Sequence, residues 1–426
     1  LVALAVFIPV SGWVADRFGA RRTFVAAIAV FLLGSLGCAA SDGLGQLVAG
    51  RFVQGVGGAM MVPVGRLVLL RSIDKAGLVR ALSWLTIPAM LGPMLGPVLG
   101  GAITTYAHWR FIFLINLPIG VLGMWLAWRH VPELRQAVAP LDWRGFVLSA
   151  GGLALAMSGL SAVGRTAVPA VAIASCVLVG TGLLVAYVRH ARRHPDPLLR
   201  LDLFAVPTFR AGVLGGSLFR IGIGATPFLL PLMLQLGFGL NPLQSGLITF
   251  TSTAGAMVMK TLAPRIIRQF GFRPLLVWNG LAAALAMCLF GLFRVDTPYW
   301  LMVCVLLASG CLRSLQFTSI NAIAYADIDR ERMSQASSLA AMAQQVALAL
   351  GVILGGYALS LAGVLTGRPG EDPINFTFAF LGVGLVSAMS VWEMRRLAPD
   401  AGAEMAGHAQ AGREVAEPKV EARPQG

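Results

Sequence analysis

The stretch Gly12–Arg22 reads GWVADRFGARR and joins two apolar runs, at residues 1–14 and 23–40. A short loop with three arginines between such runs is typical of helices that are connected on the cytoplasmic face of a membrane. Asp16, at the end of the first run, can pair with basic groups or with a helix N-terminus on a neighbouring span. The stretch therefore predicts an all-α polytopic membrane protein whose first loop can latch neighbouring helices together.

The composition of the whole chain agrees with a membrane location. Of 426 residues, 57% are hydrophobic and only 12% are charged, and the mean hydropathy is +0.77. Soluble domains carry about 25% charged residues, so a soluble globular enzyme is excluded. A net charge of +14 would suggest nucleic acid as the partner of a soluble protein, but here it predicts basic loops beside a lipid bilayer.

Apolar runs of about 20 residues, the length that crosses a bilayer, divide the chain into thirteen predicted spans. Their approximate bounds are 1–14, 23–40, 47–70, 81–104, 111–128, 145–163, 168–188, 211–236, 243–263, 274–293, 299–325, 334–365 and 374–392.

The distribution of Lys and Arg between alternate loops gives the orientation of these spans. One set of loops, together with the C-terminal tail, carries 24 of the 33 basic residues. The opposite loops carry Arg110, Arg165, Arg294 and Arg368. The positive-inside rule therefore predicts a cytoplasmic C-terminus in a cell inner membrane. Thirteen spans then put Leu1 outside, so we expect one further helix before it.

A weak internal repeat and a charged linker predict two transmembrane halves. Arg17–Arg21 (RFGAR) resembles Gln269–Arg273 (QFGFR), and both lie in loops on the predicted cytoplasmic side, as parallel-repeat transporters require. The longest basic connection, residues 187–210, is predicted to link the halves. The predicted domains are an N-terminal half (1–130), a linker region with two additional helices (131–205), a C-terminal half (206–396) and a disordered cytoplasmic tail (397–426).

The cysteines predict no metal site and no cofactor. They show no CxxC spacing and no nearby histidine, and each lies in an apolar run where a small core residue is expected. They are Cys38, Cys176, Cys288, Cys304 and Cys311.

Two motifs in the N-terminal half resemble signatures of the major facilitator superfamily. The first loop is similar to G-x3-D-[RK]-x-G-x-[RK]-[RK] at every defined position. The matching residues, which the resemblance implies form a conformational latch, are Gly12, Asp16, Arg17, Gly19, Arg21 and Arg22. The stretch Arg51–Ala59 (RFVQGVGGA) resembles R-x2-Q-G-x-G-x-A, and this resemblance implies that Arg51 takes part in proton coupling. A positive-inside anchor and a snorkelling arginine are the alternatives.

Two further runs resemble one branch of that superfamily. The first is similar to the G-x3-G-P-x2-G-G motif of its antiporters, through Gly92, Pro93, Gly96, Pro97, Gly100 and Gly101. The second, Trp109–Gly120, is similar to a run of the fourteen-helix drug:proton antiporters of the EmrB/QacA type. Thirteen spans plus one preceding helix give fourteen. Closely spaced Gly and Pro also fit a kinked, closely packed helix contact, which generic GxxxG packing would equally explain.

Two departures from the family pattern stand out. The resemblance implies a preceding helix with an acid that takes part in proton exchange, and no residue of this sequence matches it. In the second copy of the loop, Arg268 stands where the repeat would place its Asp, so a latch in the C-terminal half must work differently.

The predicted spans contain cations but no acid near their middle, since Asp16 and Glu393 lie at span ends and the other acids in loops or the tail. The cations are Arg51, Arg66, Arg220, Lys260 and Arg313, of which Arg66 is predicted to be interfacial. The remaining ones in the C-terminal half, Arg220, Lys260 and Arg313, could line a substrate cavity with Gln54, Gln235, Gln316 and Asn321. Snorkelling or structural pairing is the alternative. Such an excess of cations favours neutral, zwitterionic or anionic substrates.

These observations predict a proton-coupled exporter of amphipathic small molecules that works by alternating access and needs no cofactor. Its expected partners are its substrates, protons and the bilayer, and no nucleic acid. A uniporter or symporter for a metabolite is the alternative within the same fold. A membrane-embedded lipid-linked transferase is a remote alternative, because the loops show no paired-carboxylate or nucleotide-binding motif.

Overall fold

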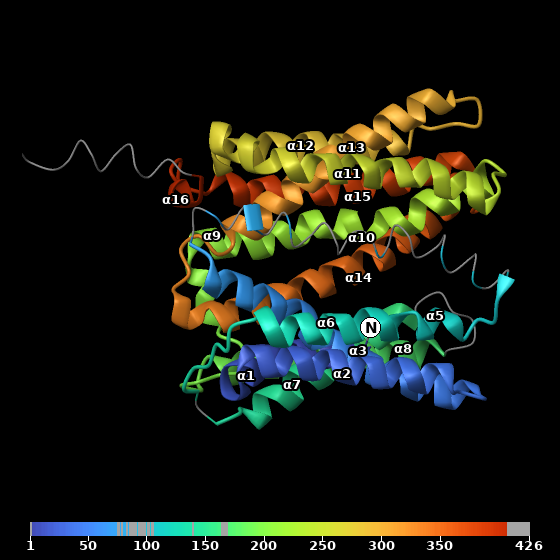
Figure 1. Ribbon diagram of the computed structural model, residues 1–426. Coiled ribbons are helices and arrows are strands. Elements are labelled where there is room, and N and C mark those ends of the chain that lie inside the picture. The colour runs from blue at the N-terminus through green and yellow to red at the C-terminus, as the bar shows by residue number, and fades with distance from the viewer. Residues whose placement is uncertain are drawn as a thin grey trace, which may run out of the picture.

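The chain folds into a bundle of long helices (Figure 1). The computed structural model describes residues 2–406, apart from most of 75–105, residue 139 and residues 163–168. The described elements are α1 (Val2–Phe18), α2 (Ala20–Ala39), α3 (Leu44–Ser72), α5 (Phe111–Leu114), α6 (Asn116–His130), α7 (Trp143–Ala162), α8 (Ala170–Ala191), η1 (Leu201–Ala205), α9 (Pro207–Arg210), η2 (Ala211–Gly215), α10 (Gly216–Leu232), η3 (Met233–Gly237), α11 (Pro242–Phe270), α12 (Phe272–Phe290), α13 (Tyr299–Ile323), η4 (Arg330–Arg332), α14 (Met333–Thr366), α15 (Pro373–Arg395) and α16 (Ala403–Ala406).

The helices match the predicted spans along the chain. Twelve of the thirteen predicted spans coincide with described helices, and the fourth, residues 81–104, lies outside the described residues except at isolated positions. Ten candidate spans in the described part are long and apolar enough to cross a bilayer. Of the other two helices, α1 has only 17 residues and α11 carries Ser, Thr and Gln in its first turns. The prediction of an all-helical polytopic protein is confirmed.

The helices form two groups with one helix between them (Figure 1). In the first group, α2 packs on α3 and α6, while α1 packs on α3 and α7, so the additional pair α7–α8 attaches to the first half. In the second group, α11 packs on α13, and α12 packs on α13 and α15. Helix α14 contacts both groups, because it packs on α10 and α15 as well as on α1 and α3.

Close approach of α10 and α14 depends on two glycines. A Cβ atom on Gly224 would collide with the backbone of Leu348, and one on Gly351 would collide with the backbone of Ile221. Small residues let helices pack at short range inside a bilayer, where the hydrophobic effect does not draw them together. The contact fixes α14 firmly to the second group.

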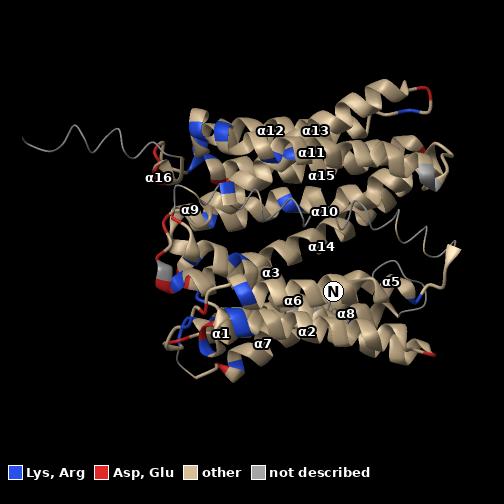
Figure 2. Ribbon diagram, viewed as in Figure 1, with Lys and Arg blue, Asp and Glu red and all other residues tan. Residues whose placement is uncertain are grey.

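Lys and Arg residues gather at one end of the bundle, as Figure 2 shows. We call this the basic end; it holds the loop between α1 and α2, the connections α6–α7 and α8–η1, the loop between α11 and α12, and α16. The largest hydrophobic cluster includes residues of both groups and of the connection between them, such as Leu67, Leu199 and Phe272. The two groups are therefore joined by a shared core.

The predicted disordered tail begins with an ordered stretch. Met405 and Ala406 are buried in the main hydrophobic cluster, and Gly402 lies against Phe272 and Ile323. Residues 397–406 thus depart from the prediction because their few apolar side chains find a partner surface, whereas residues 407–426 lie outside the described part.

Candidate functional site

The most connected polar group at the basic end is Asp16, in the last turn of α1. Its carboxylate is buried, and Oδ1 accepts a hydrogen bond from Nη1 of Arg71 at 2.7 Å. Oδ2 accepts a short hydrogen bond from the hydroxyl of Ser334. Because Ser334 lies in the first turn of α14, the N-terminal end of that helix dipole also favours the negative charge. One carboxylate therefore connects α1, α3 and α14.

A segment after α6 completes the surroundings of this ion pair. Arg71 Nη2 donates to the side-chain Oε1 of Gln136 at 2.8 Å. The backbone N–H of Gln136 donates to the backbone carbonyl of Asp16 at 3.2 Å. The side chain of Arg71 is only 6% exposed, so its charge depends on these acceptors. Removing one partner of a buried ion pair is strongly destabilising because the other charge remains unpaired.

The N-terminal half of the latch motif lets α1 approach α14. A Cβ atom at Gly12 would lie 2.6 Å from Oγ of Ser338 and 2.8 Å from the carbonyl oxygen of Ser334. The hydroxyls of Ser11 and Ser338 are 3.2 Å apart. Glycine at position 12 therefore permits the helix contact in which Asp16 reaches Ser334.

The other predicted latch residues serve the turn between α1 and α2. Gly19 has a φ of +97°, and a Cβ atom there would collide with the carboxylate of Glu133. Glu133 pairs with Nε of Arg21 at 3.4 Å and Nε of Arg22 at 3.8 Å, whereas Arg17 is exposed. Thus Asp16 pairs with an arginine of α3, and the basic residues of its own loop hold the connection after α6.

Further contacts between the two groups lie beside Asp16. The hydroxyl of Ser337 donates to the carbonyl of Pro63 at 3.2 Å, and Nη1 of Arg66 lies 3.4 Å from the hydroxyl of Tyr325. Arg66 is 8% exposed and therefore buried between the groups, because the loop after α13 covers this part of α3.

These contacts involve only the first third of α14. Ile8 and Ala59 form a small apolar cluster with Ala341, against which Met342 packs. Farther along, the contacts described for α14 are with the second group, as at Gly351. Within the described residues, the two groups are thus held together at the basic end.

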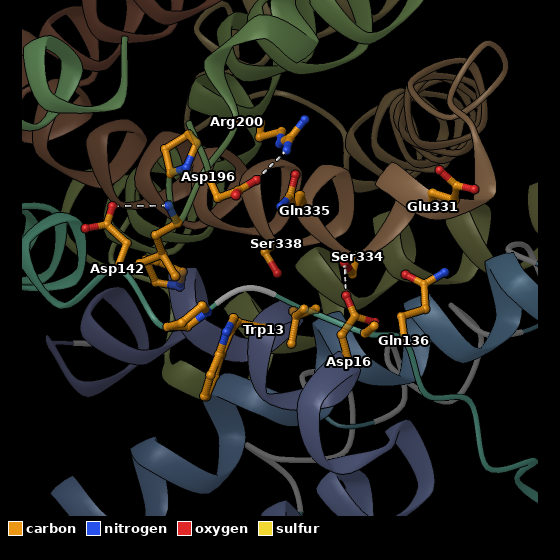
Figure 3. Close-up of a pocket in the computed structure, with 17 residues that line it drawn as sticks. Trp13, Asp16, Gln136, Asp142, Asp196, Arg200, Glu331, Ser334, Gln335 and Ser338 are labelled. Atoms are coloured by element: carbon orange, nitrogen blue, oxygen red, sulfur yellow. Dashed lines mark hydrogen bonds and ion pairs between the residues drawn. The ribbon is translucent and has the colours of Figure 1, made fainter. Parts of the chain in front are cut away.

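The same region contains a polar cavity of about 410 Å³ (Figure 3). It is bounded by α1, the connection before α7, the linker after α8 and the start of α14. Its lining includes Trp13, Asp16, Asp196, Glu331 and Gln335. The ionic contact of Asp16 therefore borders a cavity where four segments of the chain meet.

Arg51 lies in a second polar network, near the opposite end of α3. Its Nη1 donates to Oε1 of Gln54 at 2.5 Å, and Gln54 donates through Nε2 to the hydroxyl of Ser35 at 2.7 Å. Asn116 also donates to Ser35, at 3.2 Å. Arg51 itself is exposed and lies 5.9 Å from the ring of Phe113. Among the described residues, no carboxylate pairs with this arginine.

Three predicted cavity residues come together around one aromatic ring in the C-terminal half. Arg220 and Lys260 lie 5.5 Å and 5.6 Å from the ring centroid of Phe317. Arg220 donates to Oδ1 of Asn321 at 3.1 Å, and Lys260 donates to the hydroxyl of Thr318 at 2.7 Å. Both cations are almost fully buried, and Nε of Arg220 has no hydrogen-bond partner among the described residues.

The remaining predicted cavity residues are not part of this cluster. Gln316 connects α13 to α12 through the carbonyl of Leu276 and the amide of Asn279. Gln235 lies in η3, beyond the far end of α10, and its amide is 3.4 Å from the hydroxyl of Ser245. Arg313 is half-buried on α13 and has no hydrogen bond to another described residue.

The predicted antiporter motif is largely outside the described residues. Gly92 is its only described member, and nothing lies within 4 Å of a Cβ atom built there. The other members are Pro93, Gly96, Pro97, Gly100 and Gly101.

Sequence reasoning missed the partners of Asp16. Arg71 lies 55 positions away, and Ser334 lies 318 positions away in the other group. The only signal in the sequence is that both lie at ends of predicted spans on the same side of the membrane, a property that many other residues share.

Comparison with known proteins gives a consistent result. The model of the Major Facilitator Superfamily matches residues 1–352 and, in a second match, residues 212–420. A protein of Pectobacterium atrosepticum, named as a candidate multidrug resistance protein, MdtD, is 37% identical over 405 residues, or 94% of this chain and 86% of that protein. Its namesake in Salmonella paratyphi B is 38% identical over 363 residues, covering 85% and 77% of the two chains.

Solved structures share the fold at low sequence identity. The human organic anion transporter MFSD10 (TETRAN) has a TM-score of 0.68 at 16% identity, with 92% of this chain and 81% of that chain covered. The proton:xylose symporter XylE has a TM-score of 0.63 at 15% identity, with 92% and 84% covered.

Proposed function

Because the chain belongs to the major facilitator superfamily, a family of membrane transporters, we propose that it exports amphipathic small molecules in exchange for protons. The names of its relatives, which mark them as candidate multidrug resistance proteins, support export of such compounds. Transport would proceed by alternating access, with the proton gradient as the driving force and no cofactor. Family membership argues against the lipid-linked transferase.

The contact of Asp16 with Arg71 and Ser334 carries this proposal. It joins the two groups of helices at the basic end, where opening requires that α14 separate from α1. Within this proposal, Asp16, Gly12 and Ser334 form the latch that closes the cytoplasmic side. Gly19, Arg17, Arg21 and Arg22 shape and anchor its turn. Breaking the latch would expose the substrate pathway to the cytoplasm, as rigid-body switching of two domains requires.

Arg51 is proposed as a proton-coupling residue. It lies in the first half on α3, where its hydrogen bond to Gln54 is supported in turn by Ser35. An arginine stays protonated, so its role would be to hold and tune a carboxylate that exchanges the proton. The anchored Gln54 fixes the guanidinium in the position from which it acts.

Substrates are proposed to contact the cationic group in the C-terminal half. Arg220 and Lys260 have buried donors beside the face of Phe317, and Asn321 orients Arg220. An aromatic ring flanked by donors suits compounds that combine an apolar body with acceptor groups. Neutral, zwitterionic or anionic amphipathic molecules would fit this lining better than strongly cationic ones.

The proposed orientation places the basic end in the cytoplasm of the cell that carries this inner-membrane protein. The loops that gather there hold most of the Lys and Arg residues, as the positive-inside rule requires. The chain would consist of two transmembrane halves, residues 1–130 and 206–396, with the additional helix pair in residues 131–205. The ordered start of the tail packs at the same end, which supports a cytoplasmic C-terminus.

The test is transport in inside-out vesicles energised with a pH gradient. Uptake of amphipathic fluorescent dyes of negative, zero and positive charge is measured together with substrate-dependent alkalinisation of the vesicle lumen. Asp16→Asn and Arg51→Ala are compared with Arg193→Ala, which alters an exposed basic residue of another loop at the basic end. We expect Arg193→Ala to retain exchange, Asp16→Asn to lose transport, and Arg51→Ala to lose gradient dependence.

Three outcomes would contradict the proposal. Transport that is indifferent to the gradient would indicate a uniporter, and protons moving with the substrate would indicate a symporter. Undiminished gradient-driven export by Arg51→Ala would remove that residue from the coupling mechanism.

A further inference from the structure

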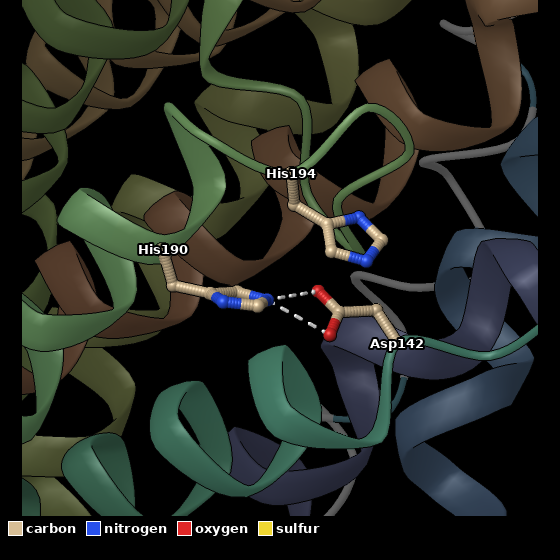
Figure 4. Close-up of side chains that lie close together, drawn as sticks. All are labelled: Asp142, His190 and His194. Carbon is tan, nitrogen blue, oxygen red and sulfur yellow. Dashed lines mark hydrogen bonds and ion pairs between the residues drawn. The ribbon is translucent and has the colours of Figure 1, made fainter.

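Three side chains with metal-ligating atoms meet at the basic end, outside the proposed transport machinery (Figure 4). Asp142 directly precedes α7, His190 lies in the last turn of α8, and His194 follows four residues later. One ligand atom from each lies within 4.8 Å of the others. The two imidazole rings are 5.1 Å apart between centroids, and Figure 4 shows both beside the carboxylate.

The carboxylate is held in place before any ligand arrives. Oδ1 of Asp142 accepts a hydrogen bond from the amide of Gly145 at 2.8 Å, and Oδ2 accepts one from the amide of Leu198 at 3.4 Å. Nε2 of His190 lies 2.9 Å and 3.0 Å from the two oxygens. Burial opposes ionisation of Asp142, but these hydrogen bonds and His190 together lower its pKa below the usual value. The group is thus an oriented carboxylate that faces an imidazole.

We propose that Asp142, His190 and His194 bind a divalent transition-metal ion, with Zn²⁺ as the best-suited species. Two imidazoles and one carboxylate are a ligand set that Zn²⁺ accepts, with water in the fourth position. The metal would take the place of the proton between His190 and Asp142. The backbone amide of His194 donates to the carbonyl of His190 at 3.0 Å, so the turn that follows α8 keeps the two imidazole rings next to each other.

Helix capping alone does not account for this arrangement. Capping of α7 needs only Asp142 and the amide of Gly145, and an ion pair between α7 and α8 needs only His190 in addition. His194 contributes to neither, since its described hydrogen bond is from the amide of Asp196 to Nδ1, at 3.2 Å. A metal on Nε2 would shift the ring proton to Nδ1, so this contact would be exchanged for a metal–nitrogen bond. The position of His194, which neither capping nor the ion pair explains, therefore supports a metal site with three protein ligands.

A bound metal would fasten the additional helix pair to the linker. It would connect the start of α7 with the end of α8, and through Leu198 with the segment that leads to the second group. Asp142 and Leu198 also line the polar cavity at the basic end, so the open coordination position would be reached from water. The proposed site is therefore structural.

The test measures metal binding by tag-free, full-length protein in detergent, without any transport assay. Co²⁺ is titrated while its visible absorption is recorded, and Zn²⁺ is then used to displace it. We expect one equivalent of Co²⁺ with the absorption of a four- or five-coordinate ion, and a rise in Tm on adding Zn²⁺. His194→Gln should weaken binding by at least the roughly 10- to 100-fold that loss of an outer-shell partner causes.

Two controls keep the result interpretable. His108→Gln removes an exposed histidine at the opposite end and should leave binding unchanged. His194→Gln is preferred to Asp142→Asn as the decisive variant, because His194 caps no helix and its loss should not impair folding. Absence of stoichiometric binding by the wild type, or equal affinity in His194→Gln, would overturn the proposal and leave a cluster that shares a proton.

Discussion

The loops α1–α2 and α11–α12 have the same backbone turn but different chemistry. Gly19 and Gly271 have φ values of +97° and +74°, and each lies between a phenylalanine that ends one helix and the first residue of the next. Position 16 carries a buried carboxylate bonded to Arg71 and Ser334, whereas the corresponding position of the second loop carries an exposed arginine, Arg268. The repeat therefore has the same turn in both halves and a buried acidic contact in the first.

The largest expected effect is on Asp16. Asp16→Ala leaves Arg71 buried without its carboxylate, which should lower the free energy of unfolding by about 3–5 kcal/mol. Arg268→Ala removes an exposed charge and should change it by less than about 0.5 kcal/mol. Thermal unfolding in detergent measures both, and equal losses would mean that the loops do not differ as described.

A smaller effect is expected for Ser334, which donates a hydrogen bond to Asp16 from α14. Ser334→Ala removes a hydrogen bond to a charged acceptor between the two groups, a contact worth about 1.5–3 kcal/mol. Its loss should favour the conformer that is open at the basic end. The rate at which a Ser338→Cys side chain reacts with a water-soluble thiol reagent should therefore rise. An unchanged rate would show that other contacts hold the basic end closed.

The two glycines should respond unequally to the same substitution. Alanine at either position incurs the strain of a positive φ, about 1–2 kcal/mol. At Gly19 the new methyl group also displaces Glu133, whereas nothing lies within 4 Å at Gly271. Gly19→Ala should thus lower Tm more than Gly271→Ala. The reverse order would show that Glu133 can move aside without any loss of stability.

The smallest effect is expected at the start of α7, where a carboxylate side chain caps the helix, in contrast to the glycines at the starts of α2 and α12. The N-cap glycines of α2 and α12 make no side-chain cap, whereas Asp142 caps α7 with a folded pKa below its usual value. This stabilisation is complete above the unfolded value of about 4 and is lost as pH falls through the folded pKa. Asp142→Ala should cost about 1 kcal/mol at neutral pH and show a flatter fall of Tm on acidification. Parallel pH profiles would contradict this.

The span pattern could be predicted because hydropathy alone requires it. A run of apolar residues in lipid must satisfy its own backbone hydrogen bonds, which leaves the helix as the only local solution. Extension of α1 to Phe18 and α11 to Phe270 was not predicted, because their last turns leave the apolar stretch while the backbone hydrogen bonding continues.

The site could be predicted only where one short motif contains it. Asp16 and Gly12 follow from their spacing, but Arg71 and Ser334 do not, since no local rule selects them. The contact of Arg66 with Tyr325 was not predicted either, because 259 positions separate the two residues. The cluster at Asp142 was missed for the same reason, since 48 positions separate it from His190.

Helix α14 is long enough that a small movement at the basic end produces a large displacement at its other end. It has 34 residues, and the contacts with the first group that the described residues show lie within its first ten, Met333 to Met342. The arm beyond Met342 is about 36 Å long, and a tilt of roughly 10° would move its tip by about 6 Å. If the contact between Ser334 and Asp16 breaks, α14 can tilt together with the second group, to which it is fixed, and the far end of α14 then moves by this distance relative to the first group.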